Sequence, residues 1–265
     1  MLQHRIAPTI LGVFMLLGVC WAGSERSEEV KRIQSASSVM NEIMAAPDKG
    51  IPEEILSSAT CVAVVPSMIK GGFIVGGNYG KGVATCHIGS GWSAPAPFVI
   101  GGGSFGFQIG GEEVDLVMLV MNERGMQQLL SSKFKLGADA SVAAGPVGRH
   151  AEGNTDWKMR AEVLSYSRAR GIFAGVALDG AVIKQDNDET KALYGAANSF
   201  STILKGQVAA PDGSQPFLAA VKKYTSRAKK DEASEKKVEN VPESTAHRNT
   251  AKARMPKAGE PSGSN

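Results

Sequence analysis

Glycine is distributed unevenly along this chain, and the distribution restricts the folds that the chain can adopt. Of its 31 glycines, 22 lie between Gly71 and Gly180, where they interrupt short runs of β-branched and aromatic residues. Glycine supplies the bends, bulges and tight turns between short strands, and no long helical pattern occurs in this region. We therefore expect an α+β fold built on a strongly curved, glycine-rich antiparallel sheet or partial β-barrel, with flanking helices.

The predicted strands follow the runs of β-forming residues between positions 61 and 184. Paired glycines at 71–72, 76–77 and 110–111 predict turns or bulges, and Asp179-Gly180 predicts a two-residue hairpin between the last two strands. The predicted strands are Cys61–Val65, Phe73–Val75, Val83–His87, Phe98–Ile100, Phe105–Ile109, Val114–Met121, Ser141–Ala144, Ala161–Ser167, Ile172–Leu178 and Ala181–Lys184.

Helical patterns precede and follow this region and occur once within it. Residues 27–46 predict an amphipathic helix with Ser27 as its N-cap, and a short helix is expected from Pro52 to Thr60. Two further helices are expected over Glu123–Leu130 and Pro216–Arg227. Packing of the first helix on the sheet is the favoured interpretation, and insertion of its apolar face into a membrane is the alternative.

Residues 1–22 have the pattern of an export signal. The apolar run Ile10–Ala22 has 13 residues, whereas a membrane span needs about 20. Small residues at Cys20 and Ala22 occupy the −3 and −1 positions of a cleavage site before Gly23. We therefore expect an exported protein, periplasmic or secreted. A lipoprotein anchored through Cys20 is the alternative, although the bulky valine before that cysteine makes a poor acylation site.

The remaining chain divides into one domain, expected at 28–227, and a disordered basic tail at 228–265. From Lys222 to the end there are 11 basic and 6 acidic residues, which give this part a net charge of +5. The rest of the chain carries −2, and the two together make the net charge of +3. The tail contains almost no large apolar residue, as in disordered segments. The domain's own charge balance indicates no nucleic-acid partner.

Two cysteines, Cys61 and Cys86, remain after removal of the leader. In an oxidising compartment they either pair or stay as free buried thiols, and their spacing does not distinguish these states. There is no CxxC pair and no cluster of cysteine with histidine. The sequence therefore predicts neither a zinc site nor any other cofactor.

The segment 101–106 contains two motifs that are usually associated with catalysis or nucleotide binding. Gly101, Gly103 and Gly106 match GxGxxG, and Ser104 occupies the nucleophile position of GxSxG. Both motifs require a strand, a turn and then a helix, and the serine also requires a histidine and an acid. More strand-like sequence follows instead, and no triad is recognisable. We therefore predict no enzymatic activity.

Two acidic features have structural explanations. Asp186-Asn187-Asp188-Glu189 lacks the spacing of a calcium loop, and Asp188 is predicted to cap a helix over Glu189–Leu193. Asp115 lies in an apolar strand without a second carboxylate in an evident pattern. It is expected to accept backbone hydrogen bonds rather than to transfer protons.

Two basic segments are candidate binding sites. In Lys133–Lys135 and Arg168–Arg170 the cations alternate with Phe134 or Ala169, so extended backbone places each pair on one face, which Tyr166 shares with the second pair. They are interpreted either as solvated strand faces or as a patch for phosphate headgroups. Four such cations would contribute about 4 kcal/mol at an anionic membrane surface.

Several collinear motifs resemble one known family. They are Lys70-Gly71-Gly72-Phe73, Gly91-Trp92-Ser93-Ala94-Pro95, Gln108-Ile109-Gly110-Gly111, Val114-Asp115, the run from Ser141 to Arg149, Tyr166-Ser167 and the run from Gly171 to Val176. Over about residues 28–195 the chain is similar to the SYLF domain, the yeast-type actin-binding domain family, and specifically to its exported bacterial members.

The resemblance implies a non-enzymatic lipid-binding domain. Eukaryotic members bind phosphoinositides and some bind actin, so the expected partner of an exported member is an anionic phospholipid or membrane surface in the cell envelope, with acyl chains accepted by an apolar helix face or a barrel cleft. The alternative is a protein-interaction or scaffold module with a protein partner, actin-binding-like by family analogy. The candidate headgroup-binding residues are Lys70, Lys133, Lys135, Arg149, Arg168 and Arg170.

Overall fold

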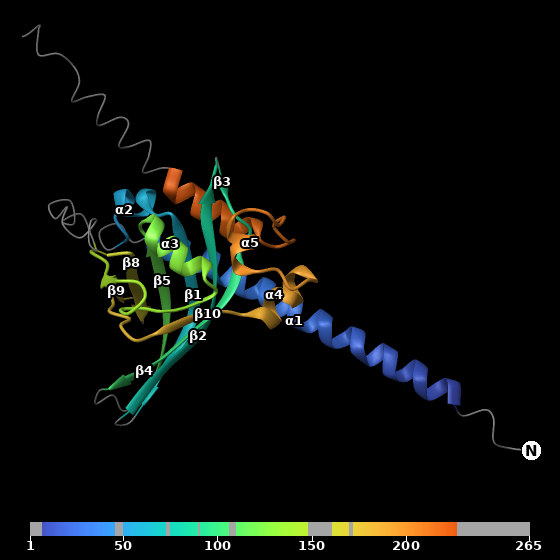
Figure 1. Ribbon diagram of the computed structural model, residues 1–265. Helices are drawn as coiled ribbons and strands as arrows, with labels where there is room; N and C mark the ends of the chain where they lie inside the picture. The colour runs from blue at the N-terminus through green and yellow to red at the C-terminus, as the bar shows by residue number, and fades with distance from the viewer. Residues whose placement is uncertain are drawn as a thin grey trace, which may run out of the picture. The chain divides into compact units, whose positions relative to one another are not determined.

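The computed structural model describes residues 7–45, 50–72, 75–89, 91–105, 110–147, 161–169 and 172–226. The predicted tail at 228–265 lies outside these ranges, as do Arg149 and Arg170. The helices are α1 (Ala7–Met44, with side chains described from Glu25), α2 (Glu53–Ser58), α3 (Glu123–Leu130), α4 (Asn187–Tyr194), α5 (Phe200–Leu204) and a last helix over 215–226 (Figure 1). The strands are β1 (Cys61–Gly72), β2 (Val75–Ile88), β3 (Gly91–Trp92), β4 (Ala96–Phe105), β5 (Gly110–Val120), β6 (Lys133–Lys135), β7 (Val142–Ala144), β8 (Val163–Ala169), β9 (Ile172–Gly175) and β10 (Val182–Gln185).

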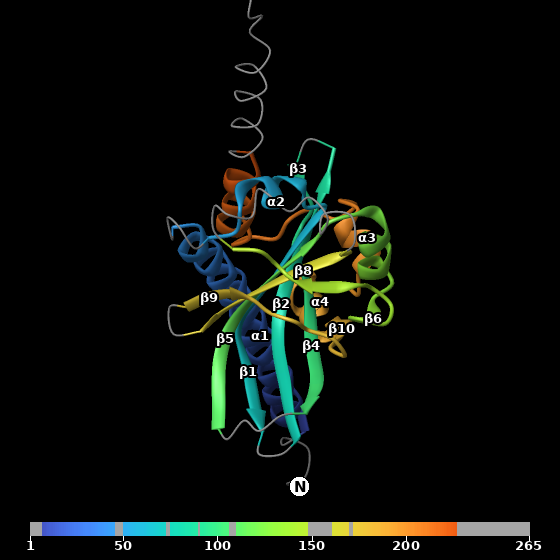
Figure 2. The ribbon, with the colours of Figure 1, turned by 90° about the vertical axis from the view of Figure 1, so that its left-hand side faces the viewer.

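All ten strands belong to one curled sheet. The main path runs β6-β10-β4-β2-β1-β5-β8-β7, and β3 and β9 pair with β2 and β8 respectively. Neighbouring strands are antiparallel except β7 and β8, which are parallel. Figure 2 shows the sheet curling into an open half-barrel with helices around it. The predicted α+β class and curved, glycine-rich sheet are confirmed, and the parallel pair is an addition to the expected antiparallel pattern.

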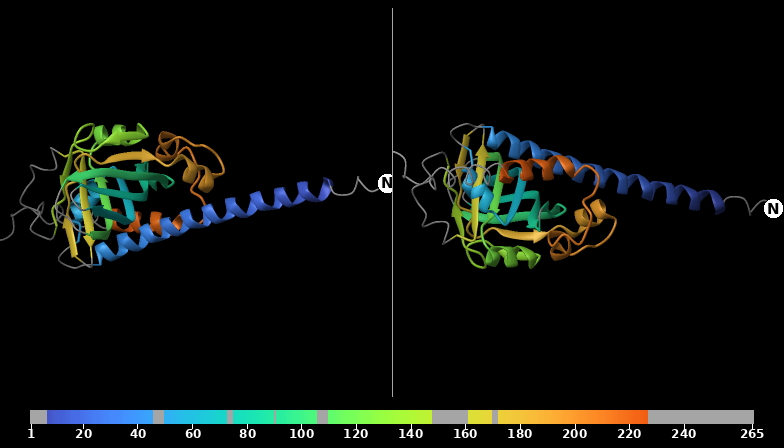
Figure 3. Two further views of the ribbon diagram at one scale, coloured as in Figure 1. Left: turned by 90° about the horizontal axis from the view of Figure 1, so that it is seen from below. Right: turned by 90° about the horizontal axis from the view of Figure 1, so that it is seen from above.

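Each face of the sheet has its own apolar core. The concave face is filled by side chains from the sheet and from α3 and α5, with Phe98, Met118, Phe134 and Phe200 among its buried residues. The outer face is covered by α1, α2 and the helix over 215–226. Figure 3 shows α1 and the last helix along one side of the strands. Because its own side chains fill the concave face, the structure does not support the expectation that a barrel cleft accepts acyl chains.

Helix α1 buries its apolar face on the sheet, as the favoured interpretation predicts. Ile33, Met40 and Ile43 are each at most 1% exposed, and they pack with the valines of the outer face of β1 and β2. The helix begins well before Ser27, so the predicted N-cap at that residue is wrong. Burial of this face leaves its large apolar side chains unable to enter a membrane while the helix stays docked.

The central strands are longer than the runs of β-forming residues predicted. Glycines 71–72, expected in turns, pair with glycines 76–77 on β2 and 110–111 on β5. Further along, Gly82 fits where a side chain would not, because a Cβ atom there would lie 2.5 Å from the carbonyl oxygen of Val64 and 2.8 Å from the ring of Phe98. Glycine therefore extends these strands and allows close packing, where the sequence predicted interruptions.

The predicted hairpin at Asp179-Gly180 is wrong, although a turn does form there. Gly180 has a φ of 86°, and Ala181 N donates to Leu178 O. The strands on either side do not pair with each other, since β9 pairs with β8 whereas β10 lies between β4 and β6. The turn thus sends the chain to the opposite edge of the sheet, which local sequence does not indicate.

Helix positions were predicted better than N-caps, since the predicted cap at Asp188 is wrong, as is the one at Ser27. The prediction of α3 over Glu123–Leu130 is confirmed, and Asn122 caps it by accepting a hydrogen bond from Gly125 N. Helix α4 begins earlier than predicted, because Asp186, and not Asp188, accepts from Glu189 N as its N-cap. Short helix α5, capped by Ser199, was not predicted.

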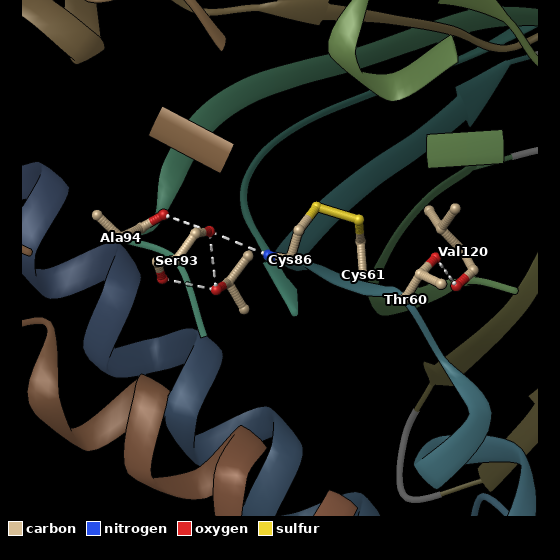
Figure 4. The surroundings of a disulfide bond; sticks show 7 residues. Thr60, Cys61, Cys86, Ser93, Ala94 and Val120 are labelled. Atoms are coloured by element: carbon tan, nitrogen blue, oxygen red, sulfur yellow. Dashed lines mark hydrogen bonds between the residues drawn. A yellow bond between two sulfur atoms is a disulfide. The ribbon is translucent and has the colours of Figure 1, made fainter. Parts of the chain in front are cut away.

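Cys61 and Cys86 form a disulfide between the paired strands β1 and β2, which resolves the alternative left open by spacing. Both cysteines are fully buried. Figure 4 shows the surrounding hydrogen bonds: Thr60 Oγ1 donates to Val120 O at 2.9 Å, and Cys86 N donates to Ser93 Oγ at 3.0 Å. The disulfide therefore fixes the ends of β1 and β2 beside the point where β5 joins them.

We predict that replacing both Cys61 and Cys86 with alanine lowers the free energy of unfolding by about 3 kcal/mol, since the bond closes a loop with a sequence separation of 25 residues. Urea unfolding followed by circular dichroism measures this loss. A reductant should shift the wild-type midpoint toward that of the variant and leave the variant unchanged. Equal midpoints for the variant and the oxidised wild type would contradict the prediction.

Candidate functional site

Two predicted lysines lie on the outer surface of the short edge strand β6. The strand has an exposed–buried–exposed pattern, in which Phe134 enters the concave core while Lys133 and Lys135 point away from it. This confirms that the two lysines share one face. Asp139 is nearby, but its carboxylate accepts a hydrogen bond from the backbone N of Lys135 at 2.7 Å. That bond closes the turn that follows β6.

A third lysine, Lys184 on β10, joins this pair. Lys184 is directly opposite Lys133 in the antiparallel register, and it is exposed. Opposed residues share a face, with Cβ atoms about 5 Å apart, and like charges in such positions destabilise the pairing. Within the described ranges no carboxylate forms an ion pair with any of the three lysines. We call this group, Lys133, Lys135 and Lys184, the lysine edge.

Lys70, another predicted site residue, lies apart from the lysine edge. It follows Met68 on the same side of β1, and Met68 faces the concave core, so Lys70 is on the opposite face from the lysine edge. Across from it on β5 is Glu112. The structure therefore does not bring Lys70 together with the other described lysines.

Arg168 is tied to two carboxylates. Its Nε and a terminal nitrogen donate to Asp115 Oδ2 at 3.0 and 2.6 Å, and its other terminal nitrogen donates to Glu42 on α1. Desolvation acts to lower the pKa of Arg168, but the hydrogen bonds to Glu42 and Asp115 outweigh it and raise the pKa. The guanidinium stays charged and its charge is compensated inside the protein. Tyr166 shares its face, as predicted, but is fully buried and stacks on Phe173.

Asp115 also stabilises a β-bulge in β1. The register of β1 shifts against both neighbours after Val65, and Ser67 in this bulge has a φ of 54°. Its backbone N donates to Asp115 Oδ1 at 3.1 Å. One carboxylate therefore joins the bulge, the arginine of β8 and, through that arginine, helix α1. The predicted structural role of Asp115, accepting a backbone hydrogen bond, matches this geometry.

The glycine-rich motif at 101–105 is part of β4. Its residues pair one by one with β2, from Tyr79 opposite Gly101 to Val75 opposite Phe105. Strand β5 begins at Gly110, four residues after β4 ends. The described residues of the motif are thus strand, and they do not themselves form the helix N-terminus required for dinucleotide binding or the elbow required for a nucleophilic serine.

A charged network joins α1, α4 and β2. Arg32 of α1 donates to Glu29 and, at 2.5 Å, to Glu189 of α4, while Lys81 of β2 contacts Glu189 and lies 3.4 Å from Asp186. Desolvation lowers the pKa of Arg32. Both cations are paired with carboxylates in this network, which docks α1, although the buried Oε1 of Glu29 has no hydrogen-bond partner.

The described part of the chain has neither a metal-ligand cluster nor a helix that could span a membrane. No group of histidine, cysteine, aspartate and glutamate there is arranged to hold a metal ion. Likewise, none of the described helices is long and apolar enough to cross a membrane.

Comparison with known proteins gives one consistent family. Residues 101–224 match the family described as Ysc84, Las17-binding protein actin regulator. The chain is 35% identical over 171 residues to SH3 domain-containing protein PJ696.02 of Schizosaccharomyces pombe, covering 63% of this chain and 40% of that protein. It is 33% identical over 183 residues to SH3 domain-containing YSC84-like protein 1 of Rattus norvegicus, covering 68% and 54%.

A third relative is Protein YSC84 of Saccharomyces cerevisiae, 31% identical over 182 residues, which cover 67% of this chain and 38% of that protein. The similarity thus spans about two fifths to a little over half of the length of these relatives.

We predict that Asp115→Ala lowers the free energy of unfolding by about 2–3 kcal/mol, because it leaves the bulge N–H of Ser67 and the Arg168 guanidinium without their acceptor. Thermal and urea unfolding measure the loss. The matched control is Glu113→Ala, an exposed carboxylate two residues earlier on β5, which should change stability by no more than about 0.5 kcal/mol. Equal effects of the two substitutions would contradict this role for Asp115.

Proposed function

Because this chain belongs to the Ysc84 (SYLF) family, we propose that it is a non-enzymatic module that binds an anionic membrane surface through the lysine edge. The observation that carries the proposal is the opposition of Lys133 and Lys184 across two strands, with Lys135 beside them and no carboxylate paired to any of the three among the described residues. A bound phosphate headgroup would relieve the repulsion between these cations.

The strength of this contact is modest. Each lysine near an anionic membrane contributes about 1 kcal/mol, so three contribute about 3 kcal/mol, or about 100-fold in partitioning. Such binding is reversible and sensitive to salt. Of the other predicted cations, Lys70 faces the opposite side and Arg168 is neutralised by Asp115 and Glu42, so we assign them a smaller part. Arg149 and Arg170 remain predicted contributors.

The proposed place of action is outside the cytoplasm, in the periplasm or as a secreted protein. The export-signal pattern of residues 1–22 and the buried Cys61–Cys86 disulfide both support an oxidising compartment. Anchoring through Cys20 would keep the same surface beside a membrane and is the alternative form.

We predict that Lys133→Glu, Lys135→Glu and Lys184→Glu together weaken binding to vesicles of phosphatidylglycerol and phosphatidylcholine at least 100-fold, by the arithmetic above. Flotation of the full chain with such vesicles measures the partitioning. Binding of the wild type to pure phosphatidylcholine vesicles should be weak.

The matched control reverses three exposed lysines on other elements, Lys31 on α1, Lys205 after α5 and Lys222 on the last helix. This variant has the same net charge as the test variant. It should keep most of the vesicle binding if the lysine edge forms the contact. An equal loss in both variants would mean that only net charge matters and would exclude a localised site.

A second candidate function, binding of a protein partner, is favoured by the family comparison. The matching family is described as a Las17-binding actin regulator, and relatives carry SH3 domains in addition. Saturable binding of a protein in the absence of vesicles, unchanged in the lysine-edge variant, would favour this function. Cosedimentation and pull-down experiments with the full chain distinguish it from vesicle binding.

A further inference from the structure

Two large apolar side chains are exposed next to each other on the outer face of the sheet. Ile69 of β1 is 59% exposed and Tyr79 of β2 is 54% exposed. They are directly opposite each other in the register of the two strands. Single exposed apolar residues are common on protein surfaces, whereas an adjacent pair on a flat strand surface is a feature that an interaction can use.

The pair belongs to a row of residues that crosses the sheet to the lysine edge. Tyr79 is opposite Gly101 of β4, Gly101 is opposite Val182 of β10, and Val182 is opposite Lys135 of β6. Residues in such a row share one face of the sheet. At about 4.8 Å between strands, the backbones of Tyr79 and Lys135 are about 14 Å apart along the sheet. The apolar pair and the lysine edge therefore lie on the same, outer face of the curled sheet.

The strands beyond this row carry almost no side chains on that face. Gly77 of β2 is opposite both Gly71 of β1 and Gly103 of β4, and Gly71 is opposite Gly111 of β5. Figure 2 shows β1, β2, β4 and β5 running side by side toward the lower end of the view, past β8, β9 and β10. Because glycine has no side chain, these positions do not prevent a membrane surface from approaching Ile69 and Tyr79.

The charged residues around this surface indicate which kind of partner binds to it. The three lysines lie at the β6–β10 side of the row and Glu113 lies opposite Ile69 on β5, while Asp186 and Glu189 on the same face are paired with Lys81 and Arg32. A tyrosine next to an aliphatic side chain, with cations in reach, is the combination found at the membrane–water interface. Glu113 opposes an anionic surface at one end, and this gives the arrangement a direct test.

We infer that Ile69 and Tyr79 enter the interfacial layer of an anionic bilayer while the lysine edge holds its headgroups. The inference rests on the proposed function and adds to it an apolar contact and an orientation, with the part of the outer face that α1 leaves exposed, around Ile69 and Tyr79, against the membrane. Because the contact is apolar, it persists when salt weakens the lysine contacts.

The test compares full-length variants on vesicles of phosphatidylglycerol and phosphatidylcholine at low salt and at about 1 M salt, where the Debye length falls to about 3 Å. Ile69→Ser with Tyr79→Ser should weaken binding about 10-fold or more and remove the binding that the wild type retains at high salt. The control is Ile172→Ser, which replaces a 72% exposed isoleucine on β9 and should leave binding unchanged. Residues 1–22 are identical in every variant and add a constant background.

A third variant uses the end of the row. Glu113→Gln should strengthen binding to the anionic vesicles several-fold at low salt, since it removes the carboxylate next to Ile69. Thermal unfolding of each variant should match the wild type, because every changed side chain is exposed.

The outcomes separate the two claims. If the serine double variant binds as the wild type does at both salt concentrations, while the lysine-edge variant loses binding, insertion is overturned and the proposed function stands. If neither variant loses binding, or if the wild type does not bind, both are overturned. Equal losses in the Ile172→Ser control and the double variant would also overturn insertion at this pair.

Discussion

Strand β1 is paired along its length on both sides, and this pairing organises the rest of the molecule. Its partners β2 and β5 begin and end with it, so three long strands form a continuous centre from the buried disulfide to the glycine-rich end. The bulge at Ser67 shifts the register against both partners at the same point, which bends the strand and changes which face its side chains occupy. Before the bulge Val64 lies on the α1 side, and after it Ile69 does.

The carboxylate of Asp115 connects this bend to two other elements. It holds the backbone of Ser67 and the guanidinium of Arg168, which in turn reaches Glu42 on α1. Arg168, which the sequence suggested as a headgroup-binding cation, thus helps to hold β1, β5, β8 and α1 together. Charge alone, read from sequence, does not distinguish these roles, because the partners are 53 and 126 positions away in the chain.

The sequence predicted the fold class well and the strand partners poorly. Alternation around Phe134 correctly placed Lys133 and Lys135 on one face, because a strand's side-chain direction is a local property. Lys184 was missed as their neighbour, since the pairing of β6 with β10 is set by the tertiary fold. Paired glycines were interpreted as turns because propensity disfavours them in strands. Their neighbours across the sheet are also glycines, so the pairing of the central strands continues through them. The exposed pair Ile69 and Tyr79 was missed for a similar reason: an apolar residue in a strand is expected to be buried, and the bulge turns Ile69 outward.

The concave face of the sheet is filled by its own core, and α1 is docked on the outer face. We therefore place the contact with a membrane on the exposed part of the outer face near the glycine-rich end. Hydrogen–deuterium exchange of the full chain, with and without vesicles containing phosphatidylglycerol, tests this most directly. We predict vesicle-dependent protection in peptides that cover 67–81, 133–135 and 182–185, with α3 and the last helix unchanged. Protection confined to α1, or no protection in those strands while the protein is bound, would contradict this placement.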